Sequence, residues 1–63
     1  MFEVTKDFSW RVREKRARQR ITATRASEQI GITRQTLRFV ERGEGKIKKS
    51  VYQKIVNWLV AEE

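Results

Sequence analysis

The chain has 63 residues, which is enough for one small domain and too few for a scaffold that also encloses a substrate cavity. It contains no cysteine and no histidine, which excludes disulfides and thiolate zinc sites and removes the commonest general base and metal ligand. Fifteen Lys and Arg against eight Asp and Glu give a net charge of +7, and a basic domain of this size is expected to attract polyanions, nucleic acid above all.

The sequence shows no export or membrane signal. Its first residues, MFEVTKDF, lack the basic start and apolar run of a signal peptide, and no apolar stretch approaches the roughly 18 residues that a bilayer-crossing helix needs. We therefore expect a cytoplasmic protein with no membrane partner. No metal, cofactor or small-molecule substrate is expected. The chain also lacks a glycine-rich phosphate loop, so it is not expected to be an enzyme.

Residues 1–7 are expected to form a flexible N-terminal arm. They alternate apolar and polar side chains in a weak strand-like pattern that is too short to predict a strand. Lys6 is the only cation of this segment, so we assign the arm no role in binding nucleic acid. The domain itself is expected over residues 8–61, and residues 62–63 are expected to form a C-terminal tail.

The first helix is expected to begin between residues 7 and 9 and to end near Gln19. Either Asp7 or Ser9 can cap it, and propensity does not decide between them. Phe8 and Val12 lie four residues apart, so they share the face that meets the core, together with the aliphatic stem of Arg16.

This helix is strongly basic, since six of the ten residues from Arg11 to Arg20 are cationic. Like charges on one helix repel, so a phosphate backbone or a solvated face must make the cluster tolerable. Amphipathic membrane binding is excluded because the apolar face is too thin. Trp10 lies on a different face from Phe8, which indicates packing against another element or a second subunit.

Two short helical patterns follow between residues 21 and 43. Thr22 and Thr33 occupy the N-cap position of each helix. Gly31 and Gly43 lie where the helices end, because a helix end often requires the left-handed conformation that glycine tolerates. Two capped helices joined by a turn of about three residues form a helix-turn-helix.

The second helix of this motif has an apolar face at Leu37 and Val40 and a polar ridge away from it. The ridge consists of Arg34, Gln35 and Arg38. Arginine and glutamine have the donor and acceptor geometry that reads guanine and adenine edges in the major groove. The pattern is therefore typical of a recognition helix.

A polar loop, EGKIKK, precedes the last helix. Ser50 is expected to cap that helix, with Gln53 completing a capping box, and the helix is expected to end near Ala61. Its apolar arc is broad for a helix with three short neighbours. We expect part of it, at Trp58 and Val60, to be exposed in a monomer and covered in a dimer.

Taken together, these motifs resemble the lambda-type repressor and Cro family, also called Xre-like helix-turn-helix domains. The resemblance is carried by V-R-x-x-R at 12–16, I-G-I-T-R-Q-T-L at 30–37, V-E-R-G at 40–43 and K-I-V-N-W-L at 54–59. It implies an all-α, four-helix lambda-repressor-like DNA-binding domain with the helix-turn-helix at helices 2 and 3.

The resemblance also implies roles for individual residues. Its base-reading positions fall on Arg34, Gln35, Arg38 and Phe39. Its phosphate-binding positions fall on the start of helix 2 and on the end of helix 3 with its loop, and we expect them to be filled by Thr24, Arg25, Arg42, Lys46 and Lys48. Its buried ion pair between helix 1 and the end of helix 3 falls on Arg16 and Glu41.

The chain departs from the family pattern in three places. Ala23 stands where the family usually has glutamine, so Thr24 or Arg25 must replace that contact or it is lost. Phe39 replaces a polar residue and either touches a thymine methyl group or lies flat on the protein. Finally, many relatives continue into a fifth helix, which leaves the mode of dimerisation open.

The sequence therefore predicts a sequence-specific double-stranded DNA-binding transcriptional regulator, a repressor of the phage, plasmid or mobile-element type. It is expected to bind a palindromic site as a homodimer. The alternative is a protein-interaction module, an antitoxin or co-regulator, that binds a protein partner through the aromatic face of helix 4. For Trp10 and Trp58 we favour core or dimer packing over stacking on bases.

Overall fold

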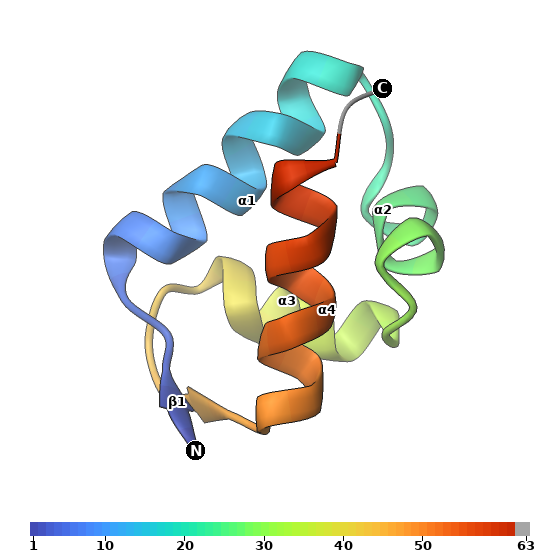
Figure 1. Cartoon of the computed structure of the whole chain (residues 1–63). Helices are drawn as coiled ribbons and strands as arrows, with labels where there is room; N and C mark the ends of the chain where they lie inside the picture. The colour runs from blue at the N-terminus through green and yellow to red at the C-terminus, as the bar shows by residue number, and fades with distance from the viewer. Residues whose placement is uncertain (62–63) are drawn as a thin grey trace.

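The computed structural model describes residues 1–61, which form four helices and two short strands (Figure 1). In chain order the elements are β1 (Phe2–Glu3), α1 (Lys6–Gln19), α2 (Ala23–Ile30), α3 (Arg34–Glu41), β2 (Lys46–Ile47) and α4 (Lys49–Val60). The predicted all-α, four-helix fold is confirmed. The tail predicted at residues 62–63 lies outside the described residues.

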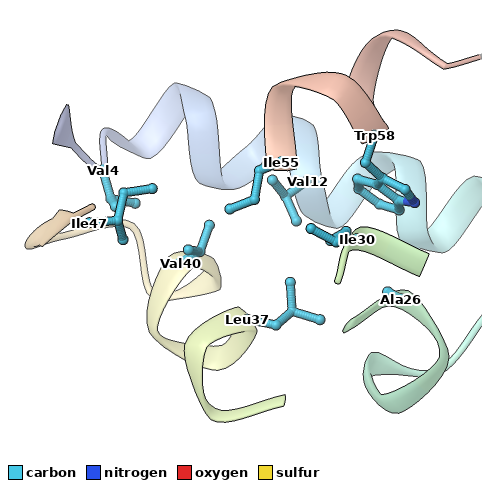
Figure 2. Packing of buried hydrophobic residues seen from close by; sticks show 9 residues of the cluster. All are labelled: Val4, Val12, Ala26, Ile30, Leu37, Val40, Ile47, Ile55 and Trp58. Carbon is cyan, nitrogen blue, oxygen red and sulfur yellow. The ribbon is translucent and has the colours of Figure 1, made fainter. Parts of the chain in front are cut away.

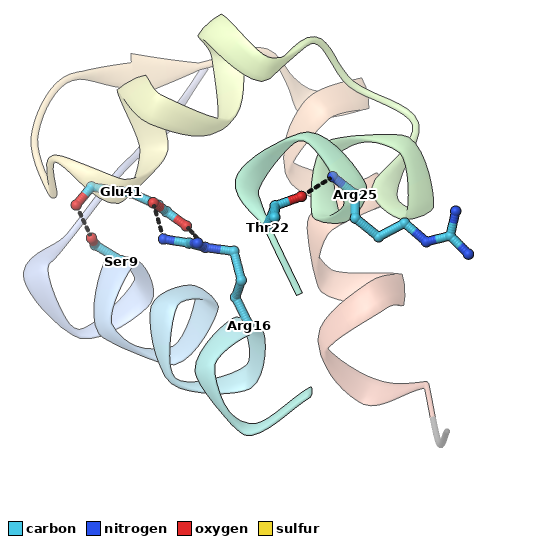
Figure 3. Close-up of polar contacts among 5 residues, drawn as sticks. All are labelled: Ser9, Arg16, Thr22, Arg25 and Glu41. Carbon is cyan, nitrogen blue, oxygen red and sulfur yellow. Dashed lines mark hydrogen bonds and ion pairs between the residues drawn. The ribbon is translucent and has the colours of Figure 1, made fainter. Parts of the chain in front are cut away.

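The helix-turn-helix is formed by the local signals that predicted it. The hydroxyl of Thr22 accepts a hydrogen bond from the Arg25 amide at 3.1 Å (Figure 3), and that of Thr33 accepts one from the Thr36 amide at 3.1 Å. Gly31 ends α2 in the left-handed conformation with φ 92°. Both predicted N-caps are therefore confirmed.

The predicted start of the first helix was wrong. The helix begins at Lys6, and its cap is Thr5, whose hydroxyl accepts a hydrogen bond from the Phe8 amide at 3.0 Å. Neither Asp7 nor Ser9 caps it. Ser9 is buried, and its hydroxyl donates to the main-chain carbonyl of Glu41 at 2.7 Å, so a tertiary contact uses the group that the sequence offered as a cap.

The predicted cap of the last helix was also wrong. The helix begins at Lys49, and Lys48 is its N-cap without a side-chain hydrogen bond. Ser50 lies within the first turn, and Gln53 donates to Asn57 at 3.1 Å instead of completing a capping box. The cause is β2, because the chain leaves buried Ile47 in an extended conformation and reaches the helix two residues earlier than expected.

The N-terminal segment does not form the flexible arm that we expected. β1 pairs with β2 in antiparallel register, with Phe2 opposite Ile47. The amide of Val4 donates to the carbonyl of Gly45 at 2.8 Å, and its side chain is only 2% exposed. The ring of Phe2 stacks on Tyr52 at a centroid distance of 4.3 Å. The start of the chain thus closes the loop between α3 and α4.

The core lies where α1, α2, α3 and α4 meet, and Val4 and Ile47 extend it to the β1–β2 pair (Figure 2). Its buried apolar residues are Val4, Val12, Ala26, Ile30, Leu37, Val40, Ile47, Ile55 and Trp58. Trp58 was predicted to be exposed in a monomer, but it is 7% exposed, and its Nε1 donates to Gln29 Oε1 at 3.0 Å. Val60 is exposed as predicted, at 72%, whereas Trp10, which was predicted to pack against another element or a second subunit, is 56% exposed within this chain.

One cation of α1 belongs to the core, which the sequence analysis missed. Lys15 is 3% exposed, and its ammonium donates to the carbonyls of Trp58 and Ala61, the latter at 2.9 Å. It also lies 4.8 Å from the centre of the Trp58 ring. A cation at the C-terminal end of a helix satisfies carbonyls that lack partners within that helix. Lys15 lies three residues after Val12 on the core face, and this spacing was the available signal.

Candidate nucleic-acid interface

The polar ridge of α3 lies on the outer side of the molecule. Leu37 and Val40 are completely buried, whereas Arg34, Gln35 and Arg38 are exposed. The helix therefore uses one face to hold its place in the core and presents the opposite face to solvent. Three of the four predicted base-reading side chains share that outer face.

The C-terminal end of α3 is fixed by α1. The guanidinium of Arg16 makes a two-fold contact with the Glu41 carboxylate, from Nε to Oε2 at 2.8 Å and from Nη2 to Oε1 at 3.1 Å (Figure 3). Ser9 binds the carbonyl of the same glutamate, and the Lys6 ammonium donates to the carbonyl of Arg42 at 3.3 Å. The ion pair implied by the family resemblance is thus present. It holds α3 against α1 at a defined angle.

The N-terminal end of α3 contacts the start of α2. Arg34 Nη1 lies 3.4 Å from the hydroxyl of Thr24, at hydrogen-bonding distance. Arg25 instead pairs with Glu28 on its own helix at 3.9 Å, and its side chain extends outward from α2 (Figure 3). Of the two residues expected to compensate for Ala23, Thr24 is therefore the one that contacts α3.

Phe39 lies on the protein surface, which is one of the two placements left open by the sequence. Its side chain is half-buried, and a Cβ atom added at Gly45 would lie 2.4 Å from its Cζ. The Arg42 guanidinium lies 6.0 Å from the ring centre and 3.6 Å from a carboxylate oxygen of Glu44. The ring thus supports the loop after α3, and Gly45, with φ 91°, leaves room for it.

Residues predicted for two separate roles meet in one groove. Gln35 and Phe39 of α3 and Lys46 and Lys48 of the following loop line a hollow of about 490 Å³ with Thr33, Thr36, Ile47, Val51 and Met1. Both lysines are exposed. The groove therefore combines a base-reading candidate with cations suited to phosphate oxygens, side by side along the edge of α3.

Most cations of α1 have partners within the protein, so this helix presents fewer free charges to a phosphate backbone than we expected. Lys15 and Arg16 are held by the contacts given above. Arg11 pairs with Asp7 at 2.9 Å, and Arg18 pairs with Glu14 at 3.9 Å. Among the six cations between residues 11 and 20, Arg13 and Arg20 are the two whose side chains make neither an ion pair nor a hydrogen bond with the described residues.

The described residues contain no group of three or more acidic, histidine or cysteine side chains that could hold a metal ion. Within the same part of the chain, no helix combines the length and apolar character needed to span a membrane.

Two short capped helices, α2 and α3, joined by a tight turn at Gly31 and packed against two further helices, place the protein in the class of small helix-turn-helix domains. A family model described as helix-turn-helix matches residues 12–57, which cover α2 and α3 and most of α1 and α4. The chain belongs to this helix-turn-helix family, of the lambda repressor, Cro and Xre type, whose members are DNA-binding transcription regulators. Searches among curated proteins and solved structures gave no match.

Proposed function

We propose that the protein is a sequence-specific repressor that inserts α3 into the major groove of duplex DNA. The observation that carries the proposal is the outer face of α3, where Arg34, Gln35 and Arg38 are exposed on a helix whose opposite face is completely buried. A rigidly held helix with such side chains fits the major groove, where donor and acceptor patterns distinguish all four base pairs. The family supports a phage, plasmid or mobile-element regulator in the cytoplasm.

Base readout is assigned to the first two turns of α3. Arg34 and Gln35 lie at its N-terminus, and Arg38 follows one turn later. Arginine can bind O6 and N7 of guanine with two hydrogen bonds, and glutamine can bind N6 and N7 of adenine. We assign Phe39 only a supporting role or a contact with a thymine methyl group at the groove edge, because its ring is half-buried.

Phosphate contacts are assigned to both flanks of α3. Thr24 flanks its beginning through the contact with Arg34. Arg42, Lys46 and Lys48 flank its end, all of them exposed. Such contacts fix the register of the protein on the duplex without reading sequence. Arg25 extends away from this surface, so we propose that it contributes less than Thr24.

Two copies are expected to occupy the halves of a palindromic site about one helical turn apart, and repression would follow from steric exclusion of other proteins from the same DNA. The alternative of a protein-binding aromatic face on α4 has lost its main support. Trp58 is buried, and Tyr52 is covered by the rings of Phe2 and Phe8 at 4.3 and 5.4 Å.

The test is selection of bound duplexes from a random pool at a stated salt concentration, followed by titration of the selected site with Arg34→Ala. The substitution should cost about 1–3 kcal/mol on the selected site and relax the preference at one base pair. A loss that is equal on all sequences would mean that Arg34 contacts only phosphate, and absence of binding at low salt would refute the proposal. Arg25→Ala, which removes an exposed arginine outside the ridge, is the matched control.

A further inference from the structure

A second groove lies between α1 and α4 and has a volume of about 550 Å³. Its α4 wall is apolar and includes Tyr52, Val56, Leu59 and Val60. These residues follow one another at intervals of four, three and one, so they form a single stripe along α4. Val60 is 72% exposed, which is high for a large aliphatic side chain in a described helix of this protein.

The α1 wall of the groove carries charges of alternating sign. Asp7, Arg11, Glu14 and Arg18 lie at intervals of four, three and four residues, so they also form one stripe, which we call the charged stripe. Their side chains are between 45% and 73% exposed. The charged stripe therefore remains accessible to charged side chains of another molecule, in addition to forming its own ion pairs.

The order of charges in the charged stripe is self-complementary. If a second copy faces the first with α1 antiparallel, Asp7 lies opposite Arg18 of the other copy, and Arg11 lies opposite Glu14. In each opposing pair the two residue numbers add up to the same value, so the pairs are centred on one point of the helix. A two-fold axis through that point therefore generates all four contacts. An isologous interface requires this property, because the same patch must match itself.

The balance of charge also favours this side for contact between two copies. The whole chain carries +7, so two copies repel each other on average. The groove between α1 and α4 is lined by three acidic residues, Glu3, Asp7 and Glu14, and by three basic ones, Arg11, Lys15 and Arg18. Its lining is therefore neutral, whereas five of the seven exposed residues assigned to DNA on and around α3 are basic.

We propose that a second copy of this chain docks on the α1–α4 groove, with the two charged stripes antiparallel and the apolar α4 stripes in contact. With a total surface of 4595 Å², an interface of the usual size of about 800 Å² per partner would occupy roughly a sixth of each molecule. The charges that would pair across this interface are largely exposed and therefore screened by salt, so the association is weak and depends on concentration and salt.

This arrangement places the two DNA-reading surfaces on the outside. Ser9 and Arg16, which contact the end of α3, lie about 180° around α1 from the charged stripe at 100° per residue. In Figure 1, α4 correspondingly crosses in front of α3. A back-to-back pair would thus bind two separate DNA segments, so it is a different pair from the two copies that occupy the adjacent half-sites of one palindrome. The bridging of DNA rests on the proposed function, but the association itself does not.

The test uses charge reversal in trans and needs no DNA. Arg11→Glu and Glu14→Arg are prepared separately, and each is examined alone by sedimentation equilibrium at low salt. Each variant places like charges opposite each other twice, so self-association should weaken about ten-fold relative to the unmodified chain. In an equimolar mixture of the two variants, all four opposing pairs regain opposite signs, and association should return to the level of the unmodified chain.

Arg13→Glu is the matched control, because it makes the same change in charge on an exposed residue of α1 outside the charged stripe. It should associate at least as well as the unmodified chain, and circular dichroism of each variant should show intact helices. A chain that stays monomeric at millimolar concentration would overturn the proposal. So would a mixture that associates no better than its separate components.

Bridging is tested separately by capture of a labelled duplex on an immobilised one that carries the same selected site. Capture by the unmodified chain, and by the mixture but not by either variant alone, is the expected result. If sedimentation shows the dimer and no duplex is captured although single duplexes bind, the back-to-back geometry is wrong. If single duplexes do not bind, the proposed function fails and the association result stands.

Discussion

Gly45→Ala is predicted to destabilise the protein through a clash with Phe39 as well as through backbone strain. Gly45 has φ 91°, a conformation that costs an L-residue about 1–2 kcal/mol. The new Cβ would also lie 2.4 Å from the Phe39 Cζ, whereas carbon atoms in contact are normally about 3.5–4.0 Å apart. The ring or the loop must therefore move by about 1 Å, and overpacking of this kind costs about 1–3 kcal/mol.

Gly31 provides the control for the backbone contribution. Its φ is 92°, nearly the same as that of Gly45, but the nearest atom to an added Cβ is the flexible Lys54 side chain at 3.9 Å. Gly31→Ala should therefore show the strain alone, at about 1–2 kcal/mol. The difference between the two alanine variants then measures the contact between residue 45 and Phe39.

The assay is urea unfolding followed by circular dichroism, with midpoints compared at unchanged slope. In a Phe39→Ala background, Gly45→Ala should cost no more than Gly31→Ala does in the unmodified chain, because the obstructing ring is absent. If Gly45→Ala is no more destabilising than Gly31→Ala, or if its cost is the same with and without the Phe39 ring, the reasoning about this contact is refuted.

Three further predictions concern the contacts of α1 and the lysine loop. Lys15→Met keeps the aliphatic stem but leaves the carbonyls at the end of α4 without their cation, so the free energy of unfolding measured in urea should fall by about 1–3 kcal/mol; an unchanged value would mean that water replaces the ammonium. Arg16→Met should lower the free energy of unfolding more than the double change Arg16→Met with Glu41→Met does, because the single change leaves a carboxylate that is only 13% exposed without its partner. Equal losses in a double-mutant cycle would contradict this. Lys46→Gln should weaken binding to all duplexes alike and reduce the slope of log affinity against log salt by about 0.9, and a change in base preference would instead indicate direct readout.

The centre of the fold was predictable because its signals are local. Thr22 and Thr33 each cap a helix by accepting a hydrogen bond from an amide only three residues further along the chain. Gly31 provides the left-handed conformation that the turn requires. The apolar spacing of Leu37 and Val40 fixed which face of α3 is buried, and hence which side chains remain outside. The residues that we propose to face DNA were predicted from the same local pattern together with the family resemblance.

The errors arose where distant segments compete for a residue. Ser9 was a reasonable cap from the sequence alone, but the fold brings the carbonyl of Glu41, 32 residues away, next to its hydroxyl, which binds that carbonyl instead. Val4 and Ile47 are buried because β1 pairs with β2, and this pairing could not be predicted from either short segment alone. The same pairing shifts the start of α4. Trp58 was expected to be exposed in a monomer because the apolar arc of the last helix is broad for its three neighbours. The contacts that bury it, a hydrogen bond to Gln29 and the ammonium of Lys15, come from other helices.

The two tryptophans occupy opposite environments, which gives the molecule a pair of built-in optical reporters. Trp58 is 7% exposed beneath the ammonium of Lys15, whereas Trp10 is 56% exposed on α1. Emission from Trp58 should shift to longer wavelength when the helices separate, while that of Trp10 should already resemble emission from an indole in water. Replacing Trp10 with phenylalanine would leave Trp58 as the only tryptophan, so that fluorescence emission reports on the core alone. Such a variant is suited to following folding in the presence of DNA.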